Sequence, residues 1–153
     1  MELQDAFILD TDGTTALHTE EERGHFEYSK VKYDRPNQPV IDLAVLMHRE
    51  MAPLVVTGRM DEGDCRVDTV WWYRKYFPDY FCNDMRLFMR PAKRPNGKPD
   101  YRPDYIVKEE IYLKYIKGRF NVRYVLDDRL QVCRMWYSIG LPVLRVGDPD
   151  ADF

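Results

Sequence analysis

Cysteine is scarce in this sequence, and its placement excludes two common uses. The 153 residues include three cysteines, which are far apart and form no Cys-x-x-Cys pair: Cys65, Cys82 and Cys133. An odd number of isolated cysteines is typical of reduced thiols, because a disulfide framework or a zinc site needs several cysteines at defined spacings. The three histidines also lack the spacing of metal ligands. The pattern predicts a protein of a reducing compartment.

Long apolar runs are absent as well. No stretch approaches the ~20 apolar residues of a membrane-spanning helix, and the N-terminus carries Glu2 and Asp5 before a short apolar run, unlike a secretory signal. With the reduced cysteines, this predicts a cytoplasmic location, in the host cytoplasm if the protein is viral, and no membrane partner. The net charge of −3 argues against a large electrostatic contact with duplex nucleic acid but allows a small local one.

Hydrophobic periodicity predicts strands that alternate with helices. The expected strands are short apolar runs at residues 6–9, 54–56, 85–89, 122–126 and 143–146. The expected helices carry apolar residues at helical spacing at about 39–51, 64–76, 104–117 and 130–139. This alternation predicts an α/β fold with a mainly parallel sheet of about five strands and helices on both faces. The length predicts one domain, 1–153, and the polar segment 15–38 is long enough to form a lid.

The segment Asp10–Thr14, Asp-Thr-Asp-Gly-Thr, directly follows the first expected strand. Its first residue therefore lies at the carboxyl end of a strand, where open α/β sheets bind ligands. Two carboxylates at such close spacing repel each other unless a proton or a cation lies between them, and oxygen ligands suit Mg²⁺. A calcium loop would need Gly at its sixth position, where Thr15 stands, whereas a plain Asp-Gly turn remains an alternative.

Further polar residues follow other strands and should gather at the same edge of the sheet. They are Thr57 and Arg59, the pair Asp127 and Asp128, and Lys108 in the preceding helix. These groups suit phosphoryl transfer, which needs a nucleophile, a metal ion and donors for the phosphate oxygens. In this interpretation Asp10 attacks phosphorus and Asp12 serves as general acid and base.

In this interpretation Thr57 and Lys108 hold the phosphate oxygens. Asp127 and Asp128 help to bind Mg²⁺.

The order of these residues resembles that of the haloacid dehalogenase (HAD) superfamily of phosphotransferases. Bacterial receiver domains use similar residues, but their acidic pair precedes the phosphorylated Asp, whereas Asp127 and Asp128 come last here. The resemblance implies a Rossmann-like three-layer αβα sandwich with only a small cap or flap. Three longer blocks, 55–59, 102–111 and 127–132, are similar to the 3′-phosphatase domain of bacteriophage-type polynucleotide kinase-phosphatase.

This closer resemblance implies a set of site residues. The implied catalytic residues are Asp10, Asp12 and Lys108, and the implied metal ligands are Asp10, Asp12, Asp127 and Asp128. The implied substrate- and phosphate-binding residues are Thr57, Gly58, Arg59, Arg23 and Asp104. Two places depart from the family pattern, because Thr15 replaces an apolar residue and His25-Phe26 replaces Pro-Tyr.

Simpler interpretations exist for several of these residues. Lys108 could be a surface lysine paired with nearby glutamates, and Asp104 could be only the N-cap of its helix. The stretch 86–102 carries several basic residues, and is either a solvated loop or a basic collar for a nucleic acid backbone. In the second case, Tyr101 or Tyr105 is available to stack on a base.

The function expected from the resemblance is Mg²⁺-dependent removal of 3′-phosphate from DNA or RNA ends in repair, with activity on 2′,3′-cyclic phosphate left open. The kinase part of the resembled family is not expected within this chain, because the phosphate-loop pattern Gly-x-x-x-x-Gly-Lys-Ser/Thr does not occur. Two alternatives remain open. One is a small-molecule phosphatase of the same superfamily, such as a mononucleotidase, and the other is a non-catalytic module that binds nucleic acid ends.

Overall fold

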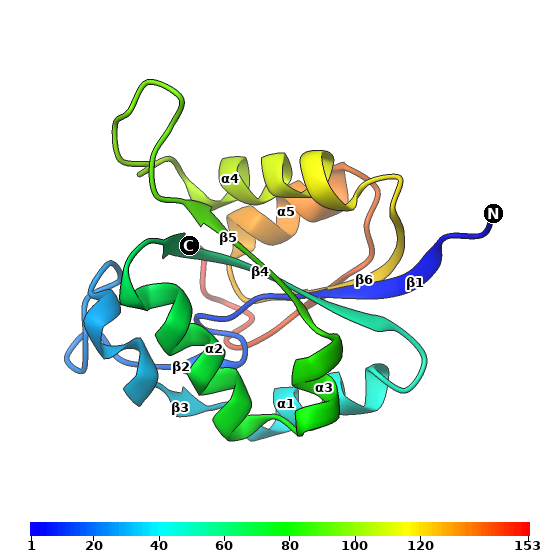
Figure 1. Ribbon diagram of the computed structural model, residues 1–153, viewed down its shortest axis with the longest axis horizontal. Coiled ribbons are helices and arrows are strands. Elements are labelled where there is room, and N and C mark those ends of the chain that lie inside the picture. The colour runs from blue at the N-terminus through cyan, green and yellow to red at the C-terminus, as the bar shows by residue number, and fades with distance from the viewer.

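Five parallel strands form the centre of the molecule, seen in a computed structural model that describes all 153 residues (Figure 1). The strand order is β5-β4-β1-β6-β7, and each neighbouring pair is parallel. The strands are β1 (Gln4–Leu9), β4 (Ala52–Asp61), β5 (Arg86–Pro91), β6 (Phe120–Asp127) and β7 (Val143–Arg145). The strand order reverses direction at β1, so the carboxyl ends of β1 and β6 meet at the topological switch point where such sheets bind ligands.

Helices cover both faces of this sheet, which confirms the predicted three-layer αβα architecture (Figure 1). One face carries α1 (Gln38–Met47), α2 (Asp64–Tyr76) and α3 (Asp79–Asp84), and the other carries α4 (Asp104–Ile111) and α5 (Leu130–Ser138). Alternate residues of β1 point to opposite faces: Ala6 and Ile8 pack with α4 and α5, whereas Phe7 and Leu9 pack with α1, α2 and α3. No helix is both long and apolar enough to cross a bilayer.

A small flap follows β1, as expected from the long polar segment. It contains the two-residue antiparallel strands β2 (Ala16–Leu17) and β3 (Arg35–Pro36) with the 3₁₀ helix η1 (Tyr28–Tyr33) between them. Contacts between η1 and α2 hold the flap against the body of the protein. The flap therefore lies beside the carboxyl end of β1.

Most predicted elements differ from the structure by a few residues at their ends, and two of them differ most. The strand expected at 54–56 continues to Asp61, because an irregularity in pairing between Thr57 and Met60 lets β4 pass through Gly58 and Arg59. The expected helix 104–117 is α-helical only to Ile111 and then continues as a π-helix, η2 (Tyr112–Ile116). Helix α3 was not predicted, since its six residues are too short for a periodic pattern.

The predicted N-cap role of Asp104 is wrong. Pro103 occupies the N-cap position of α4, and no side chain caps this helix. Asp104 is the first helical residue, and its carboxylate instead accepts hydrogen bonds from Arg90 and Arg129. The side chain is therefore committed to tertiary contacts.

Candidate active site

Three carboxylates meet at the carboxyl ends of β1 and β6. Oxygen atoms of Asp10, Asp127 and Asp128 all lie within 4.8 Å of one another. The parallel register pairs Leu9 with Leu126, so Asp10 and Asp127, which follow this pair, emerge side by side. Asp10 and Asp127 are buried, at 4% and 1% exposed. The sheet topology thus brings together acidic residues more than a hundred positions apart.

A single lysine compensates this acidic group. Lys108, from α4, places its Nζ 2.7 Å from Asp10 Oδ1 and 2.8 Å from Asp127 Oδ2. It is 1% exposed, which rules out the interpretation as a surface lysine. Three carboxylates and one ammonium leave two negative charges in excess when all four groups are ionised.

The excess negative charge shifts the pKa values of these side chains. Burial and the charge of Asp127 raise the pKa of Asp10 well above its ordinary value, although Lys108 acts in the opposite direction. Burial and Asp127 also raise the pKa of Asp128 to about 6. Burial disfavours the charged form of Lys108, but the two neighbouring carboxylates outweigh it and raise its pKa. The site therefore binds protons, or another cation, more strongly than isolated carboxylates do.

One oxygen of the acidic group has no partner. Asp128 Oδ1 is buried and accepts no hydrogen bond, an arrangement that costs free energy unless a ligand supplies a partner. Its other oxygen lies against Gly13, where a Cβ atom would approach to 2.0 Å. Gly13 also has a φ of +83°, so both the turn and the carboxylate require glycine at this position. These oxygens suit a hard divalent cation.

Asp12 lies apart from the acidic group, although it was predicted with it as a metal ligand. Its Oδ1 accepts hydrogen bonds from Arg59 Nη2 at 2.7 Å and from Arg23 Nη2 at 2.9 Å. Burial alone would raise the pKa of Asp12, but the charge and hydrogen bonds of Arg59, helped by Arg23, hold it below its usual range. In this structure its carboxylate is an ionised partner of two arginines.

Asp34 completes this second charge cluster and was missed in the sequence. Its carboxylate accepts bonds from Arg23 Nε at 2.8 Å and from Arg59 Nη2 at 2.9 Å, and its backbone oxygen accepts a bond from Trp72 Nε1. No local pattern marks Asp34, because its partners lie 11, 25 and 38 residues away. Two carboxylates and two guanidiniums form a buried, neutral network that orients both predicted phosphate-binding arginines.

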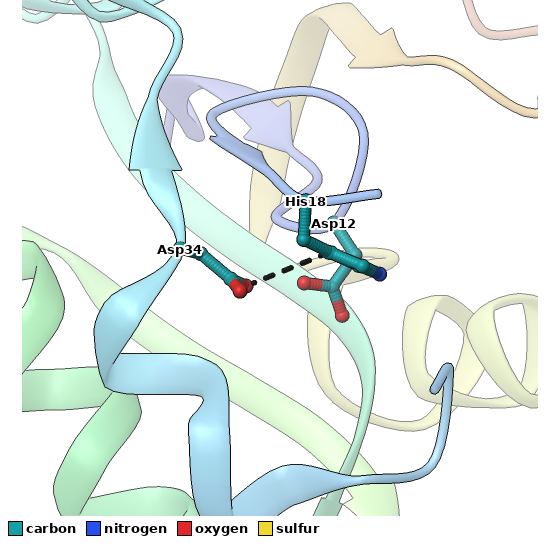
Figure 2. A group of neighbouring side chains, drawn as sticks. All are labelled: Asp12, His18 and Asp34. Atoms are coloured by element: carbon teal, nitrogen blue, oxygen red, sulfur yellow. Dashed lines mark ion pairs between the residues drawn. The ribbon is translucent and has the colours of Figure 1, made fainter. Parts of the chain in front are cut away.

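His18 lies beside the same network. Figure 2 shows Asp12, His18 and Asp34 together, with His18 Nδ1 3.7 Å from Asp34 Oδ2. One ligand atom from each of these residues lies within 4.8 Å of the others. Both carboxylates are already neutralised by arginine, however, so this group is not expected to hold a cation.

The remaining predicted residues lie within β4, where its pairing is irregular, or face it from α4. Thr57 is buried, and its Oγ1 accepts a bond from the Arg59 amide at 3.2 Å. Gly58 faces Asp104, where a Cβ atom would approach Oδ1 to 2.6 Å. Asp104 is paired with Arg90 and Arg129, two residues that were not predicted as part of the site. Close packing explains why glycine stands between Thr57 and Arg59.

Thr14, within the first motif, also touches the acidic group. Its hydroxyl donates a 2.9 Å hydrogen bond to Asp10 Oδ2, the oxygen that Lys108 does not bind. Both oxygens of Asp10 therefore have donors. These contacts fix the orientation of the predicted nucleophile.

The proposed basic collar is smaller than the sequence suggested. Arg90 is 1% exposed and donates to the backbone oxygens of Gly58, Asp100 and Arg102, so it is a structural residue. Arg102 is bound by Asp100 and Glu110. Among the basic residues of this stretch, Arg86 is exposed at the start of β5, and Lys93, Arg94 and Lys98 are exposed in the projecting loop between β5 and α4.

Comparison with known proteins identifies the family. The model of the phosphatase domain of polynucleotide kinase, HAD_PNKP, matches residues 4–153. The chain belongs to this family. The resemblance predicted from the three sequence blocks is thereby confirmed, and the expected enzyme class, a polynucleotide 3′-phosphatase, agrees with it.

Relatives of this PNKP phosphatase-family chain are longer proteins. A candidate bifunctional polynucleotide kinase/RNA ligase of Autographa californica nuclear polyhedrosis virus is 31% identical over 139 residues, which are 91% of this chain and 19% of the relative. A chain in the structure of the Pnkp1/Rnl/Hen1 RNA repair complex is 32% identical, with a TM-score of 0.80, and the match covers 97% of this chain and 44% of that one. A second structure of the Pnkp1/Rnl/Hen1 complex gives 32% identity, a TM-score of 0.82 and coverage of 97% and 47%. This chain spans less than half the length of these relatives.

Proposed function

We propose that this chain removes 3′-phosphate, and also 2′,3′-cyclic phosphate, from DNA or RNA ends during repair. The observation that carries the proposal is the buried group of Asp10, Asp127, Asp128 and Lys108 at the switch point of the sheet, in a member of the PNKP phosphatase family. The relatives are described as a polynucleotide kinase/RNA ligase and as parts of RNA repair complexes, which supports a nucleic acid end as the substrate.

The residues present fit Mg²⁺. Asp10, Asp127 and Asp128 would hold the ion, because they offer hard oxygen ligands, two excess negative charges and one buried oxygen without a partner. When bound, Mg²⁺ supplies positive charge that offsets repulsion between the carboxylates and the phosphate.

The first chemical step belongs to Asp10. A carboxylate oxygen attacks phosphorus, the bond between phosphorus and the 3′ oxygen breaks, and the phosphoryl group is transferred to Asp10 as an aspartyl-phosphate. The leaving 3′ oxygen takes a proton from Asp12. Water then attacks the aspartyl-phosphate, Asp12 accepts a proton from that water, and inorganic phosphate leaves.

The role of Asp12 depends on the two arginines. An acid needs a bound proton, whereas Arg59 and Arg23 hold the pKa of Asp12 low when no substrate is present. A phosphate dianion gives these guanidiniums, which also bind Asp34, a third anionic partner and weakens their hold on Asp12. Substrate binding thus raises the pKa of Asp12 at the stage when a proton is required.

Lys108 interacts with the nucleophile and is placed to interact with the substrate phosphate. It neutralises part of the charge on Asp10 before attack and lies where it can contact the phosphate oxygens. Its bond to Asp127 fixes the ammonium between the two strands. Because this salt bridge is buried, the lysine can orient the nucleophile without being screened by solvent.

The test is phosphate release from a panel of substrates with and without Mg²⁺: 3′-phosphate, 5′-phosphate and cyclic ends on DNA and RNA, with a generic aryl phosphate. We expect Mg²⁺-dependent release from 3′-phosphate ends, and release at background level for Asp10→Asn, because an amide cannot form the aspartyl-phosphate. Undiminished release by this variant would refute the mechanism.

The same assay, extended to 3′-mononucleotides and to a variant with charge reversal at Lys93 and Arg94, separates the alternatives. A small-molecule phosphatase would prefer mononucleotides or unrelated esters and would be indifferent to charge reversal at Lys93 and Arg94, in the exposed loop. A module that only binds ends would retain oligonucleotides without turnover. Oligonucleotide preference that is weakened by the double charge reversal supports the proposed substrate.

A further inference from the structure

Two aromatic side chains meet on the surface from separate parts of the chain. Phe26 belongs to the flap between β2 and η1, and Tyr101 belongs to the loop between β5 and α4. Their ring centroids are 5.6 Å apart in an edge-to-face arrangement at 76°. Phe26 nevertheless remains 50% exposed and Tyr101 65% exposed. Exposed rings brought together in this way retain apolar surface that a ligand can cover.

The flap side of this pair is tied to the active site. Arg23, which binds Asp12, also donates through Nη1 to the backbone oxygens of Gly24 and His25, at 3.2 and 3.5 Å. Phe26 follows directly, and the ring of His25 packs on it at a centroid distance of 4.7 Å. The aromatic ring therefore lies a short connection away from a predicted phosphate-binding arginine.

The loop side is anchored to the site through Arg90. This guanidinium donates to the backbone oxygens of Asp100 and Arg102, which flank Tyr101, at 3.1 and 2.6 Å. Its Nε donates to the oxygen of Gly58, in the phosphate-binding segment of β4, at 2.8 Å. Arg90 therefore ties the backbone on both sides of Tyr101 to Gly58 of β4.

We propose that Phe26 and Tyr101 form a platform on which the base of the terminal nucleotide stacks while its 3′-phosphate enters the site. This inference rests on the proposed function and names the part of the substrate that the flap recognises. A nucleobase fits because it presents a flat apolar face close to a phosphate, and backbone contacts of Arg23 and Arg90 tie both rings to segments that are predicted to bind phosphate. The exposed basic residues of the adjoining loop, Lys93, Arg94 and Lys98, continue the surface in the direction of the nucleic acid backbone.

The experiment compares two oligonucleotide 3′-phosphates that differ only in the last residue, which carries either a base or an abasic tetrahydrofuran. For the wild type, kcat/KM should be higher with the base, and the preference should fall about tenfold in Phe26→Leu and in Tyr101→Leu. Tyr101→Phe keeps the ring and should keep the preference. Tyr137→Leu, which removes a ring that is 77% exposed on α5, is the matched control.

A direct binding measurement makes the test independent of turnover. An oligonucleotide with 2-aminopurine as its 3′-terminal base is titrated with Asp10→Asn protein, and stacking should quench its fluorescence. The quench should be lost when Phe26→Leu is added. If the leucine variants kept the wild-type preference for a terminal base and the wild-type fluorescence quench, the platform would be overturned. If the wild type quenched the fluorescence but released no 3′-phosphate, only the proposed function would be overturned.

Discussion

Two arginines and two aspartates in the site form ion pairs that are largely buried from solvent. Arg23 and Arg59 are 2% and 0% exposed, and each binds both Asp12 and Asp34. A buried ion network of this kind adds little net stability, but loss of one member leaves an unpaired buried charge and costs much more. Asp34 is the member with no predicted chemical role, so its substitution isolates the positioning function.

Replacement of Asp34 by asparagine should weaken both stability and activity. Asparagine has nearly the same shape but no charge, so Arg23 and Arg59 would share one carboxylate. We expect the free energy of unfolding to fall by about 3–5 kcal/mol and kcat/KM for 3′-phosphate release to fall at least ~10-fold. Urea unfolding and the phosphatase assay measure the two effects.

The control for this variant is Asp42→Asn, at an exposed position of α1. It changes net charge by the same amount and should leave both measurements near the wild-type values. If Asp34→Asn resembled this control, the two arginines would have to be oriented by Asp12 and their packing alone.

At the scale of elements, the loop between β5 and α4 is fixed at its base although its tip projects from the fold (Figure 1). Asp100 is fully buried and accepts hydrogen bonds from Arg102 Nε at 2.9 Å and Nη2 at 2.8 Å. Arg102 is also bound by Glu110 of α4. The same base holds Tyr101, so this anchor supports the proposed platform.

The Asp100 anchor predicts a pH dependence. Hydrogen bonds from Arg102 lower the pKa of Asp100 in the folded protein, although burial opposes the effect. A carboxyl whose folded pKa is depressed contributes stability above its unfolded pKa of about 3.9, and this contribution is lost as the pH falls through the folded pKa. The stability deficit of Asp100→Asn should therefore be full near pH 6 and shrink in stronger acid, as measured by urea unfolding across that range.

Asp150→Asn, in the exposed C-terminal segment, provides the comparison for Asp100→Asn. Its difference from the wild type should be small at every pH. A deficit of Asp100→Asn that stayed constant down to pH 2 would show that the anchor acts through packing and not through the charge of the carboxylate.

At the scale of the whole molecule, the active-site end of the sheet concentrates uncompensated negative charge. Asp10, Asp127 and Asp128 lie at the ends of two strands that the fold brings together, and Lys108 is the cation that pairs with them directly. Folding therefore works against repulsion that a bound cation would relieve. The stability of the protein should respond to Mg²⁺ even when no substrate is present.

We expect saturating Mg²⁺ to raise the thermal unfolding midpoint by about 5–10 °C, since a ligand at a hundred times its Kd stabilises by about 2.7 kcal/mol and each kcal/mol is worth about 2–4 °C at this chain length. Differential scanning fluorimetry with and without EDTA measures the shift. Asp128→Asn should reduce this shift in the unfolding midpoint, because the substitution removes the negative charge of one ligand. Asp150→Asn should leave the shift unchanged. An equal shift in both variants would place the ion elsewhere.

Much of this fold follows from local sequence patterns. The periodicity of residues 64–76 predicts α2 with its observed bounds, and the apolar runs locate all five strands of the main sheet. Local patterns succeed here because strand and helix periods depend on neighbouring residues. They fail at Asp104, whose position suggests an N-cap, because its carboxylate binds Arg90 and Arg129, which are distant in sequence.

The site divides in the same way. By itself, the sequence determined that acidic, basic and hydroxyl residues follow the strands in an order shared with a phosphatase family, since that order is a property of the chain. Only the tertiary structure decided which charges meet: Lys108 between Asp10 and Asp127, and Asp12 with the two arginines that Asp34 also binds. The physical reason is that these pairings span up to 98 residues and depend on strand order and side-chain direction, which no local pattern records.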